Sequence, residues 1–311
     1  MATARKGMPP RIAVFTKNCT NPAYQAARIG ADLVAARFGA TTVHYVPDEP
    51  DSVPEQIELI ARAMAERPDA VVFVPVHETE VNEAILGLDA AGIPLFNIIT
   101  PTTAGSRICF VGSDDRALAA AIARYLFGKL GGRGEIVIAE GTPASATSRA
   151  RFAGFQDALA AFPAVTVRLS FCGEYQRDVA RREFSQVASE VRDIDAVLCA
   201  NDTMALGVLD ALDADASARR RPLIVGVNAL PEAVAAIAAG RMLATADFDA
   251  MKMSCIATEA AVRYLRGEQV PAEIILPVQI VDASNCAAWD VPFGTRPSPN
   301  WDDVVAGRVG L

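Results

Sequence analysis

The chain has 311 residues, of which 51% are apolar and 21% charged. This length suggests about two domains, and the composition disfavours a disordered chain or a coiled-coil array. Its 29 basic and 37 acidic residues give a net charge of −8, so it lacks the excess of cations that displaces phosphate counterions, and no nucleic-acid partner is expected. Apolar runs such as Ala70–Val76 stop far short of the roughly 20 residues that cross a bilayer, which excludes a membrane-embedded transporter subunit.

The first third of the chain alternates short apolar runs with segments of helical periodicity. Strands are predicted at Arg11–Thr16, Thr41–Val46, Ala70–Pro75 and Pro94–Ile98. The first helix has clear end signals, because Asn21 can cap it, Pro22 fits its first position and Gly39 follows its end. Strands that alternate with helices predict right-handed β-α-β units and a parallel sheet covered on both faces.

The same alternation then restarts. Strands are predicted at Arg107–Val111, Glu135–Ala139, Val165–Phe171, Ala196–Cys199 and Leu223–Val227. Helices are predicted from the cap Asp114 to about Leu130, and at Thr147–Ala161, Arg177–Val191, Asp202–Leu212, Pro231–Ala239 and Met251–Leu265. The glycines of the segment Gly131–Gly134 precede a strand and favour a helix end and a turn. No polar linker separates the two α/β halves, so several short crossings are expected, and the tail Trp289–Leu311 is expected to pack on one lobe.

The cysteines and the N-terminus add few constraints. The six cysteines are Cys19, Cys109, Cys172, Cys199, Cys255 and Cys286. They form no Cys-x-x-Cys pair, so neither a zinc site nor a redox motif is indicated, and most are expected to be buried small hydrophobes. An even count permits disulfides in an oxidising compartment without fixing their pairing. Positive charge near the N-terminus is not followed by an apolar segment, so no secretory signal is expected in this sequence.

Enzyme signatures are missing from the sequence. The first strand runs into Lys-Asn-Cys-Thr-Asn-Pro instead of a Gly-x-Gly-x-x-Gly turn, and neither a phosphate-binding loop of the Walker A type nor a Gly-x-Ser-x-Gly elbow occurs. Of the two histidines, His44 lies mid-strand and favours a structural role. His77, just past a strand end, is a candidate ligand contact, although a structural role is the more common one. Without paired metal ligands at helical spacing, the sequence predicts no enzyme, no cofactor and no metal site.

Polar, hydrogen-bonding residues follow the predicted strands, where open α/β sheets bind their ligands. They include Lys17 to Asn21, His77 and Glu78, Asn97, residues 140–142, Asn201 and Asp202, and Asn228. A single asparagine is more often a turn or cap residue, but recurrence at strand ends favours a polyhydroxylated ligand, because the amide both donates and accepts. The planar fork of Arg151 and the ring of Tyr175 would suit the hydroxyl rim and the flat face of a sugar.

The sequence resembles the type I periplasmic sugar-binding proteins, in the ribose-binding-protein-like branch that shares its fold with the ligand-binding core of lac-repressor-type regulators. The resemblance runs from about Pro10 to Val281. It is carried by Asn-Asp-Thr-Met-Ala-Leu-Gly at residues 201–207, with shorter motifs at 91–94, 111–115, 151–155 and 225–231. It implies an α/β fold of two doubly wound Rossmann-like lobes joined by a three-crossing hinge. The N-terminal lobe would comprise residues 8–108 plus 250–277, and the C-terminal lobe residues 109–249 plus 278–311.

The resemblance also implies ligand contacts, residue by residue. Asn21 and Tyr24 match the Asn-Pro-aromatic loop of the family, in which the amide bonds a hydroxyl and the aromatic flanks the ring. Arg151 matches the arginine that reaches ring and hydroxyl oxygens. Tyr175 matches an aromatic that closes one face of the sugar, and Asn201 matches the signature asparagine.

Four positions depart from the family pattern or add to it. Asn228 stands where the family usually has an aspartate, and Asn97 is our candidate replacement for the missing carboxylate of the family's Asp-Arg pair. Asp247 lies near the hinge contact and is a candidate to restore a carboxylate, whereas Lys17 is an additional cation. These departures leave the identity of the sugar open.

The resemblance implies a periplasmic, monomeric solute-binding protein that captures a monosaccharide or sugar alcohol in a cleft between its lobes. The lobes would close around the ligand, and the closed form would deliver it to the membrane permease of an ABC transporter. Crossings are expected near Ile108–Phe110, Ala246–Asp249 and Leu276–Val278. The alternative is the effector-binding core of a lac-repressor-type regulator that lacks its DNA-binding module. A third reading, an enzyme on the same scaffold, lacks a nucleophile–base pair.

Overall fold

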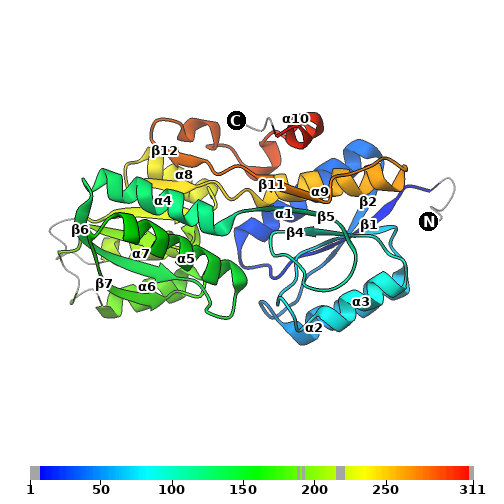
Figure 1. Cartoon of the computed structure of the whole chain (residues 1–311), viewed down its shortest axis with the longest axis horizontal. Helices are drawn as coiled ribbons and strands as arrows, with labels where there is room; N and C mark the ends of the chain where they lie inside the picture. Colours follow the sequence, from blue (N-terminus) through cyan, green and yellow to red (C-terminus); the bar gives the residue numbers. More distant parts are fainter. Residues whose placement is uncertain (1–7, 188–189, 191–192, 215–220, 308–311) are drawn as a thin grey trace. The chain divides into compact units, whose positions relative to one another are not determined.

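The computed structural model describes residues 8–187, 190, 193–214 and 221–307, and it divides into two compact units (Figure 1). Unit 1 comprises Met1–Ser113, Asp249–Pro277 and Phe293–Leu311, and unit 2 comprises Asp114–Phe248 and Val278–Pro292. Each unit contains one six-stranded sheet with helices on both faces. The predicted α/β fold of two doubly wound lobes is therefore confirmed at the level of the individual units.

Unit 1 is built on an entirely parallel sheet with the strand order β11-β5-β4-β3-β1-β2. Its strands are β1 (Arg11–Phe15), β2 (Thr41–Tyr45), β3 (Ala70–Phe73), β4 (Leu95–Ile98), β5 (Arg107–Ser113) and β11 (Glu273–Leu276). Its helices are α1 (Pro22–Phe38), α2 (Val53–Glu66), α3 (Asn82–Ala90), α9 (Ala250–Leu265), α10 (Trp301–Val305) and the short 3-10 helix η2 (Phe293–Thr295). Helices α2 and α3 cover one face of this sheet, and α1 and α9 cover the other (Figure 1).

The two faces of this sheet are packed differently. Aromatic rings fill the face under α2 and α3, where the ring of Phe15 lies 4.8 Å from that of Tyr45 and 5.2 Å from that of Phe73. On the other face α1 approaches α9 closely at Gly30, where a Cβ would lie 2.6 Å from the carbonyl oxygen of Met251. Both faces are sealed, so only the ends of the strands remain for polar chemistry.

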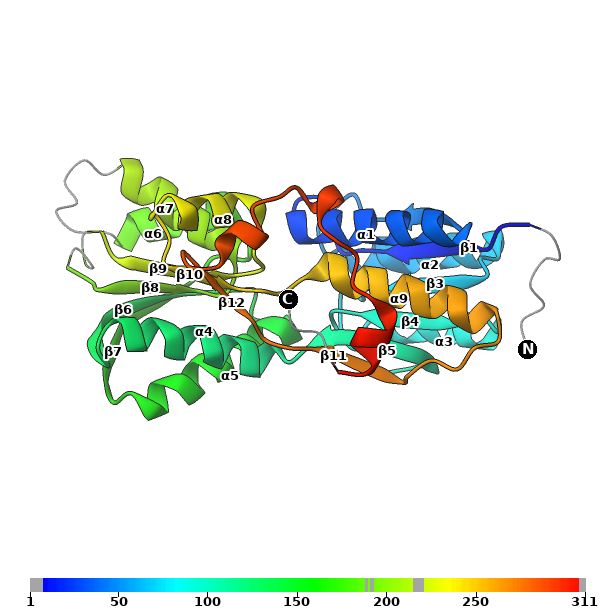
Figure 2. The same cartoon turned by 90° about the horizontal axis from the view of Figure 1, so that it is seen from above.

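Unit 2 has the strand order β12-β10-β9-β8-β6-β7, parallel except for β12, which runs antiparallel to β10. Its strands are β6 (Arg133–Glu140), β7 (Ala164–Cys172), β8 (Ala196–Cys199), β9 (Leu223–Val227), β10 (Ala244–Ala246) and β12 (Ile280–Asp282). Its helices are α4 (Asp115–Lys129), α5 (Ala146–Ala161), α6 (Arg177–Val187), α7 (Asp202–Ala214), α8 (Pro231–Ala238) and the 3-10 helix η1 (Cys286–Ala288). Figure 2 shows α4 and α5 on one face of this sheet and α6, α7 and α8 on the other.

The strongest end signals in the sequence are confirmed. Asn21 caps α1 by accepting a hydrogen bond from the amide of Ala23, Gly39 ends it at φ 71°, and Asp114 caps α4. The end of the predicted helix Arg177–Val191 lies outside the described residues apart from residue 190. Strands β10, β11 and β12 were not predicted; β10 and β12 have only three residues each, too few to show a periodicity.

The expected assignment of the lobes needs correction at two places. Strand β5 continues to Ser113 within unit 1, so the first passage between the units lies five residues beyond the expected lobe boundary after residue 108. The tail was expected wholly in the C-terminal lobe, but from Phe293 onward it belongs to unit 1, where Phe293 packs beside α1 and α9 and the ring of Trp301 lies 5.0 Å from the guanidinium of Arg263. The chain therefore passes between the units four times instead of three. Residues 308–311 of that predicted lobe lie outside the described residues.

Candidate functional site

The loop after β1 in unit 1 is braced by asparagine side chains. Asn18 Oδ1 accepts from the amide of Asn21 at 2.9 Å, and Asn18 Nδ2 donates to Asp51 Oδ1 at 3.0 Å. Asn21 Oδ1 in turn accepts from the amide of Ala23 at 3.0 Å. Lys17, in the same loop, is only 7% exposed. The loop is thus a fixed platform at the carboxyl end of β1, and it carries two of the predicted contacts, Lys17 and Asn21.

Helix α1 adds Tyr24 and a residue that the sequence analysis missed, Arg28. The guanidinium of Arg28 donates to Thr16 Oγ1 at 2.7 Å and to the carbonyl oxygen of Asn18 at 3.2 Å. Arg28 lies seven positions after the cap Asn21, and residues with that spacing share one helix face. The spacing could have identified Arg28 as a cation near the end of β1.

Asn97 does not have the geometry expected of a sugar-binding replacement for a carboxylate. It is fully buried; its Nδ2 donates to the carbonyl oxygens of Phe73 at 3.0 Å and Thr100 at 2.9 Å, and its Oδ1 accepts from the amide of Thr102 at 2.8 Å. Both amide protons are therefore used within unit 1. The structure places Asn97 as a brace between β3 and the loop after β4.

His77 is likewise engaged in its own turn. Its Nδ1 accepts from the amides of Thr79 at 3.3 Å and Glu80 at 3.2 Å, and its Nε2 lies 3.3 Å from Glu80 Oε1. The geometry favours the structural alternative for His77. His44, expected to be structural, lies with its Nε2 2.8 Å from Asp32 Oδ1.

The guanidinium of Arg151 is a buried charge held at two of its nitrogens in unit 2. Arg151 is 2% exposed, its Nε donates to Asp115 Oδ1 at 2.8 Å, and its NH1 donates to the carbonyl oxygen of Ala200 at 2.6 Å. The guanidinium carbon also lies 4.8 Å from the ring centre of Phe248 and 5.9 Å from that of Tyr175, within cation–π range. The sequence analysis did not single out Asp115 or Phe248 as neighbours of Arg151.

Tyr175 and Asn201 lie together at the carboxyl ends of β7 and β8. Asn201 is 1% exposed, its Oδ1 caps α7 by accepting from the amide of Met204 at 2.9 Å, and its Nδ2 lies 3.5 Å from the carbonyl oxygen of Tyr175. The ring of Tyr175 covers Gly141, where any Cβ would overlap it. Burial raises the pKa of Tyr175 to about 12, so its hydroxyl stays protonated near neutral pH.

Asn228 and Asp247 follow the neighbouring strands β9 and β10. Asn228 has a φ of 124°, is 6% exposed, and its Oδ1 accepts no hydrogen bond from any described residue. Asp247 is 8% exposed, and its amide donates to the carbonyl oxygen of Gln279 at 2.7 Å. Unit 2 therefore brings together all five of its predicted contacts, and Asn228 presents a buried acceptor that the fold does not use.

A fully buried carboxylate, Asp202, connects these strand ends. Its Oδ1 accepts from the hydroxyl of Thr245 at 2.7 Å, and its Oδ2 accepts from the amide of Leu230 at 2.9 Å. Burial raises the pKa of Asp202 to about 6; the charge of Asp247 also raises it, and the two hydrogen bonds and the charge of Arg151 lower it. Gly226 is required beside it, because a Cβ there would overlap Asp202 Oδ1.

Cysteines and metal ligands suggest no other chemistry in the described part of the chain. All six cysteines are described and free of disulfides, and four of them (Cys109, Cys199, Cys255 and Cys286) are buried as expected. Burial raises the pKa of Cys109 to about 12, which keeps it a thiol. Among the described residues no group of three or more His, Cys, Asp or Glu side chains could hold a metal ion, and no helix is long and apolar enough to cross a membrane.

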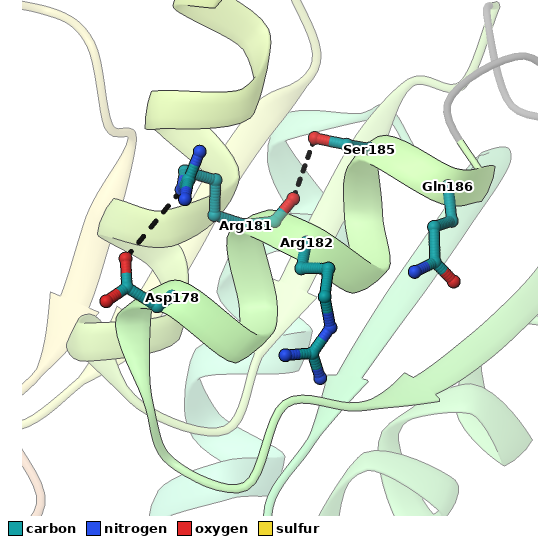
Figure 3. Close-up of a pocket in the computed structure, with 5 residues that line it drawn as sticks. All are labelled: Asp178, Arg181, Arg182, Ser185 and Gln186. Atoms are coloured by element: carbon teal, nitrogen blue, oxygen red, sulfur yellow. Dashed lines mark hydrogen bonds and ion pairs between the residues drawn. The ribbon is translucent and has the colours of Figure 1, made fainter.

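A surface pocket of about 580 Å³ lies on α6, away from these strand ends (Figure 3). It is lined by Asp178, Arg181, Arg182, Ser185 and Gln186. Its polar groups bond mainly to one another: Arg181 Nε lies 3.7 Å from Asp178 Oδ1, and the Ser185 hydroxyl donates to the carbonyl oxygen of Arg181 at 2.8 Å. This pocket lacks the buried, convergent polar groups of a specific ligand site.

Comparison with known proteins matches residues 12–269 to a family described as the periplasmic binding protein domain. The D-ribose/D-allose-binding protein of Pseudomonas aeruginosa is 28% identical over 288 residues, which cover 88% of this chain and 89% of that protein. An ABC transporter solute-binding protein of Mycobacterium smegmatis, solved with bound glycerol, is 27% identical, with a TM-score of 0.82 over 90% of this chain and 96% of its own. A periplasmic solute-binding protein of Actinobacillus succinogenes, solved with bound D-allose, has the same fold at 23% identity, with a TM-score of 0.84 over 89% of this chain and 99% of its own.

Proposed function

Because this chain belongs to the periplasmic binding protein domain family, we propose that it is an ABC transporter solute-binding protein whose ligand is a monosaccharide or a sugar alcohol. The similar proteins described above are named for D-ribose and D-allose, or hold D-allose or glycerol. These ligands share several hydroxyl groups on a short carbon skeleton. The proposal therefore names a ligand class defined by its hydroxyl groups.

The observation that carries the proposal is the buried Oδ1 of Asn228, which accepts no hydrogen bond from the described residues. A buried acceptor without a partner costs about 1–3 kcal/mol. A ligand hydroxyl that donates to this oxygen would offset that cost. An apolar ligand, or one with acceptors only, would leave it in place.

The residues around Asn228 complement such a ligand. The Arg151 guanidinium supplies fixed donors, the Tyr175 ring supplies a flat apolar face, and the Asn201 amide is held at the adjacent strand end. Asp247 adds a carboxylate at the end of β10. Alternating donors, acceptors and ring faces are what a polyol needs in order to exchange its water shell for protein groups.

In unit 1 we assign Lys17, Asn21 and Tyr24 to the surface that binds a ligand. Asn97 and His77 then serve as braces of that surface, because their hydrogen bonds are made within unit 1.

The protein would act by binding alone, as a monomer in the periplasm, and would deliver its ligand to an ABC permease without chemical change. Cofactors, metal ions and nucleic acid have no part in this function. The effector-binding core of a regulator would bind the same ligand class, but its ligand would control DNA binding instead of being delivered to a permease.

The test is ligand binding to the purified chain. Thermal unfolding is followed with D-ribose, D-allose, glycerol and myo-inositol, each at millimolar concentration, because a ligand at 100 times its Kd stabilises the native state by about 2.7 kcal/mol. We expect at least one sugar or polyol to raise Tm and to show saturable heat in calorimetry, with the sugar recovered unchanged. The absence of a shift with any of the four, and across a broader library of sugars and polyols, would overturn the proposal.

A further inference from the structure

We propose that Asp202 is a positioning residue for ligand binding: through Thr245 and Leu230 it fixes the loop that presents Asn228, and through its place in α7 it links this loop to Asn201. The inference rests on the proposed function and adds a residue with no ligand contact of its own. It arises from a fully buried carboxylate whose hydrogen bonds go to the loop after β9 and to β10.

The loop that carries Asn228 needs outside support. Asn228 and the next residue, Ala229, have φ values of 124° and 49°, a region of backbone space that side-chain-bearing residues occupy only when their surroundings hold them there. The amide of Ala229 donates to Thr245 Oγ1 at 3.3 Å, and the amide of Leu230 donates to Asp202 Oδ2 at 2.9 Å. Two successive backbone amides are thus held by the Asp202–Thr245 pair.

The charge of Asp202 sets the direction of these bonds. An ionised carboxylate can only accept, so the Thr245 hydroxyl must donate to Asp202 Oδ1, and its oxygen is left to accept from Ala229. A neutral side chain of the same shape could itself donate to the Thr245 oxygen. The Thr245 hydroxyl would then no longer have to donate to residue 202. The loop geometry therefore depends on the ionisation of Asp202 as well as on its volume.

Asp202 is also the first residue of α7, directly after Asn201, which caps that helix. One buried residue is thus bonded to the loop that bears Asn228 and covalently joined to Asn201. The charged and titratable groups that interact with Asp202 are Arg151 from α5, Asp247 after β10 and the Cys199 thiol of β8. Arg151 and Asp247 are themselves predicted ligand contacts, so the charge of Asp202 is coupled to the rest of the half-site in unit 2.

The experiment measures affinity for D-ribose and D-allose by calorimetry at pH 7.5 and pH 5.0, for the wild type and for Asp202→Asn, Thr245→Val and Thr245→Ser. We expect Asp202→Asn to bind about fivefold to tenfold more weakly than wild type at pH 7.5 and to lose most of its pH dependence. The wild type should weaken by a similar factor at pH 5.0, where Asp202 is protonated. Thr245→Val should weaken binding, and Thr245→Ser, which keeps the hydroxyl, should restore it.

The control is Asp195→Asn. Asp195 Oδ2 accepts from the amide of Glu135 at 2.9 Å, but Asp195 lies just before β8, at the opposite end of the sheet. It should leave affinity unchanged at both pH values. Equal affinities of wild type, Asp202→Asn and Thr245→Val would overturn the inference while leaving the proposed function intact, and so would a pH dependence that persists in Asp202→Asn. Failure of the wild type to bind any sugar or polyol would instead refute the proposed function itself.

Discussion

Both units carry asparagines at the carboxyl ends of their strands, but these asparagines have different hydrogen-bonding roles. In unit 1 the side-chain amides of Asn18 and Asn97 form hydrogen bonds with backbone and side-chain groups of the same unit. In unit 2 Asn228 keeps a buried oxygen that accepts no hydrogen bond from the described residues. The same residue type thus braces its own loop in one unit and, in the other, holds a buried acceptor that no described residue bonds.

This difference indicates where specificity resides. Groups fixed by buried charges keep their orientation before the ligand arrives, so little ordering is needed upon binding. Unit 2 has such a group in Arg151, which the buried carboxylate of Asp115 holds. The neutral braces of unit 1 shape a surface, to which Lys17 adds charge. We therefore expect substitutions in unit 2 to change affinity and substitutions at the braces of unit 1 to change stability.

The largest effect is expected for Arg151→Ala. This change leaves the Asp115 carboxylate buried without its cation and the carbonyl of Ala200 without a donor. Loss of one partner of a buried pair costs about 3–5 kcal/mol of unfolding free energy, and binding should be lost as well. Urea unfolding and calorimetry measure both quantities. Arg116→Ala, which removes the exposed partner of Asp157, is the matched control and should behave like wild type; an equal loss in both variants would contradict the assigned role of Arg151.

The second-largest effect is expected for Asn97→Ala in unit 1, and it concerns stability. It removes three buried hydrogen bonds between β3, β4 and the loop after β4, and at about 1 kcal/mol each the unfolding free energy should fall by about 3 kcal/mol. Sugar affinity of the folded protein should change little, because the amide protons are directed into the fold. A large loss of affinity without loss of stability would show that Asn97 is a ligand contact after all.

The sequence was informative wherever local patterns determine structure. The caps at Asn21 and Asp114 and the nine predicted strands, β1 to β9, were predicted correctly, because these features depend on residues close together in the chain. The strand-end rule also identified Asn201 and Asn228 as candidates, whereas Arg151, Tyr175 and Asp247 came from other signals. Helix-to-sheet register then brings Arg151 of α5 to the end of β8, as its bond to Ala200 demonstrates.

Long-range hydrogen bonding could not be read in the same way. Whether an asparagine braces a loop or remains available depends on which backbone groups fold against it, and Asn97 meets the backbone of Phe73, 24 residues earlier. Asp202 forms hydrogen bonds with residues 28 and 43 positions away. The sequence therefore could not predict which groups it bonds, whereas the neighbouring Asn201 was predicted from its motif. The lobe to which the tail belongs was predicted wrongly for a related reason. Phe293 and Trp301 pack on helices that lie far away in sequence.

Asn228→Ala tests the contrasting asparagine of unit 2. It should cost about 2 kcal/mol of binding free energy for the sugar that stabilises the wild type, because the ligand hydroxyl loses its acceptor in a site shielded from water. Unfolding free energy without ligand should not fall, because Asn228 Oδ1 accepts no bond from the described residues and its removal relieves the cost of an unpaired buried acceptor. Calorimetry and urea unfolding on one preparation separate the two effects. Wild-type affinity in this variant would remove Asn228 from the site.

The smallest effect concerns pH and the stability of unit 2. Burial raises the pKa of Asp202 to about 6 from its ordinary 3.8, so the folded state favours the neutral carboxyl. The stabilisation is therefore present in full below the ordinary value and is lost as pH rises through about 6. Between pH 7 and pH 5 the wild type should gain about 1 kcal/mol of unfolding free energy relative to Asp202→Asn, measured without ligand by urea unfolding. Sugar affinity should move in the opposite direction over the same interval, because the neutral form no longer enforces the Thr245 bond. A residue with a merely structural role would move stability alone, so a flat affinity would restrict Asp202 to the fold. An affinity that rises together with stability as pH falls would contradict the positioning role of the ionised carboxylate.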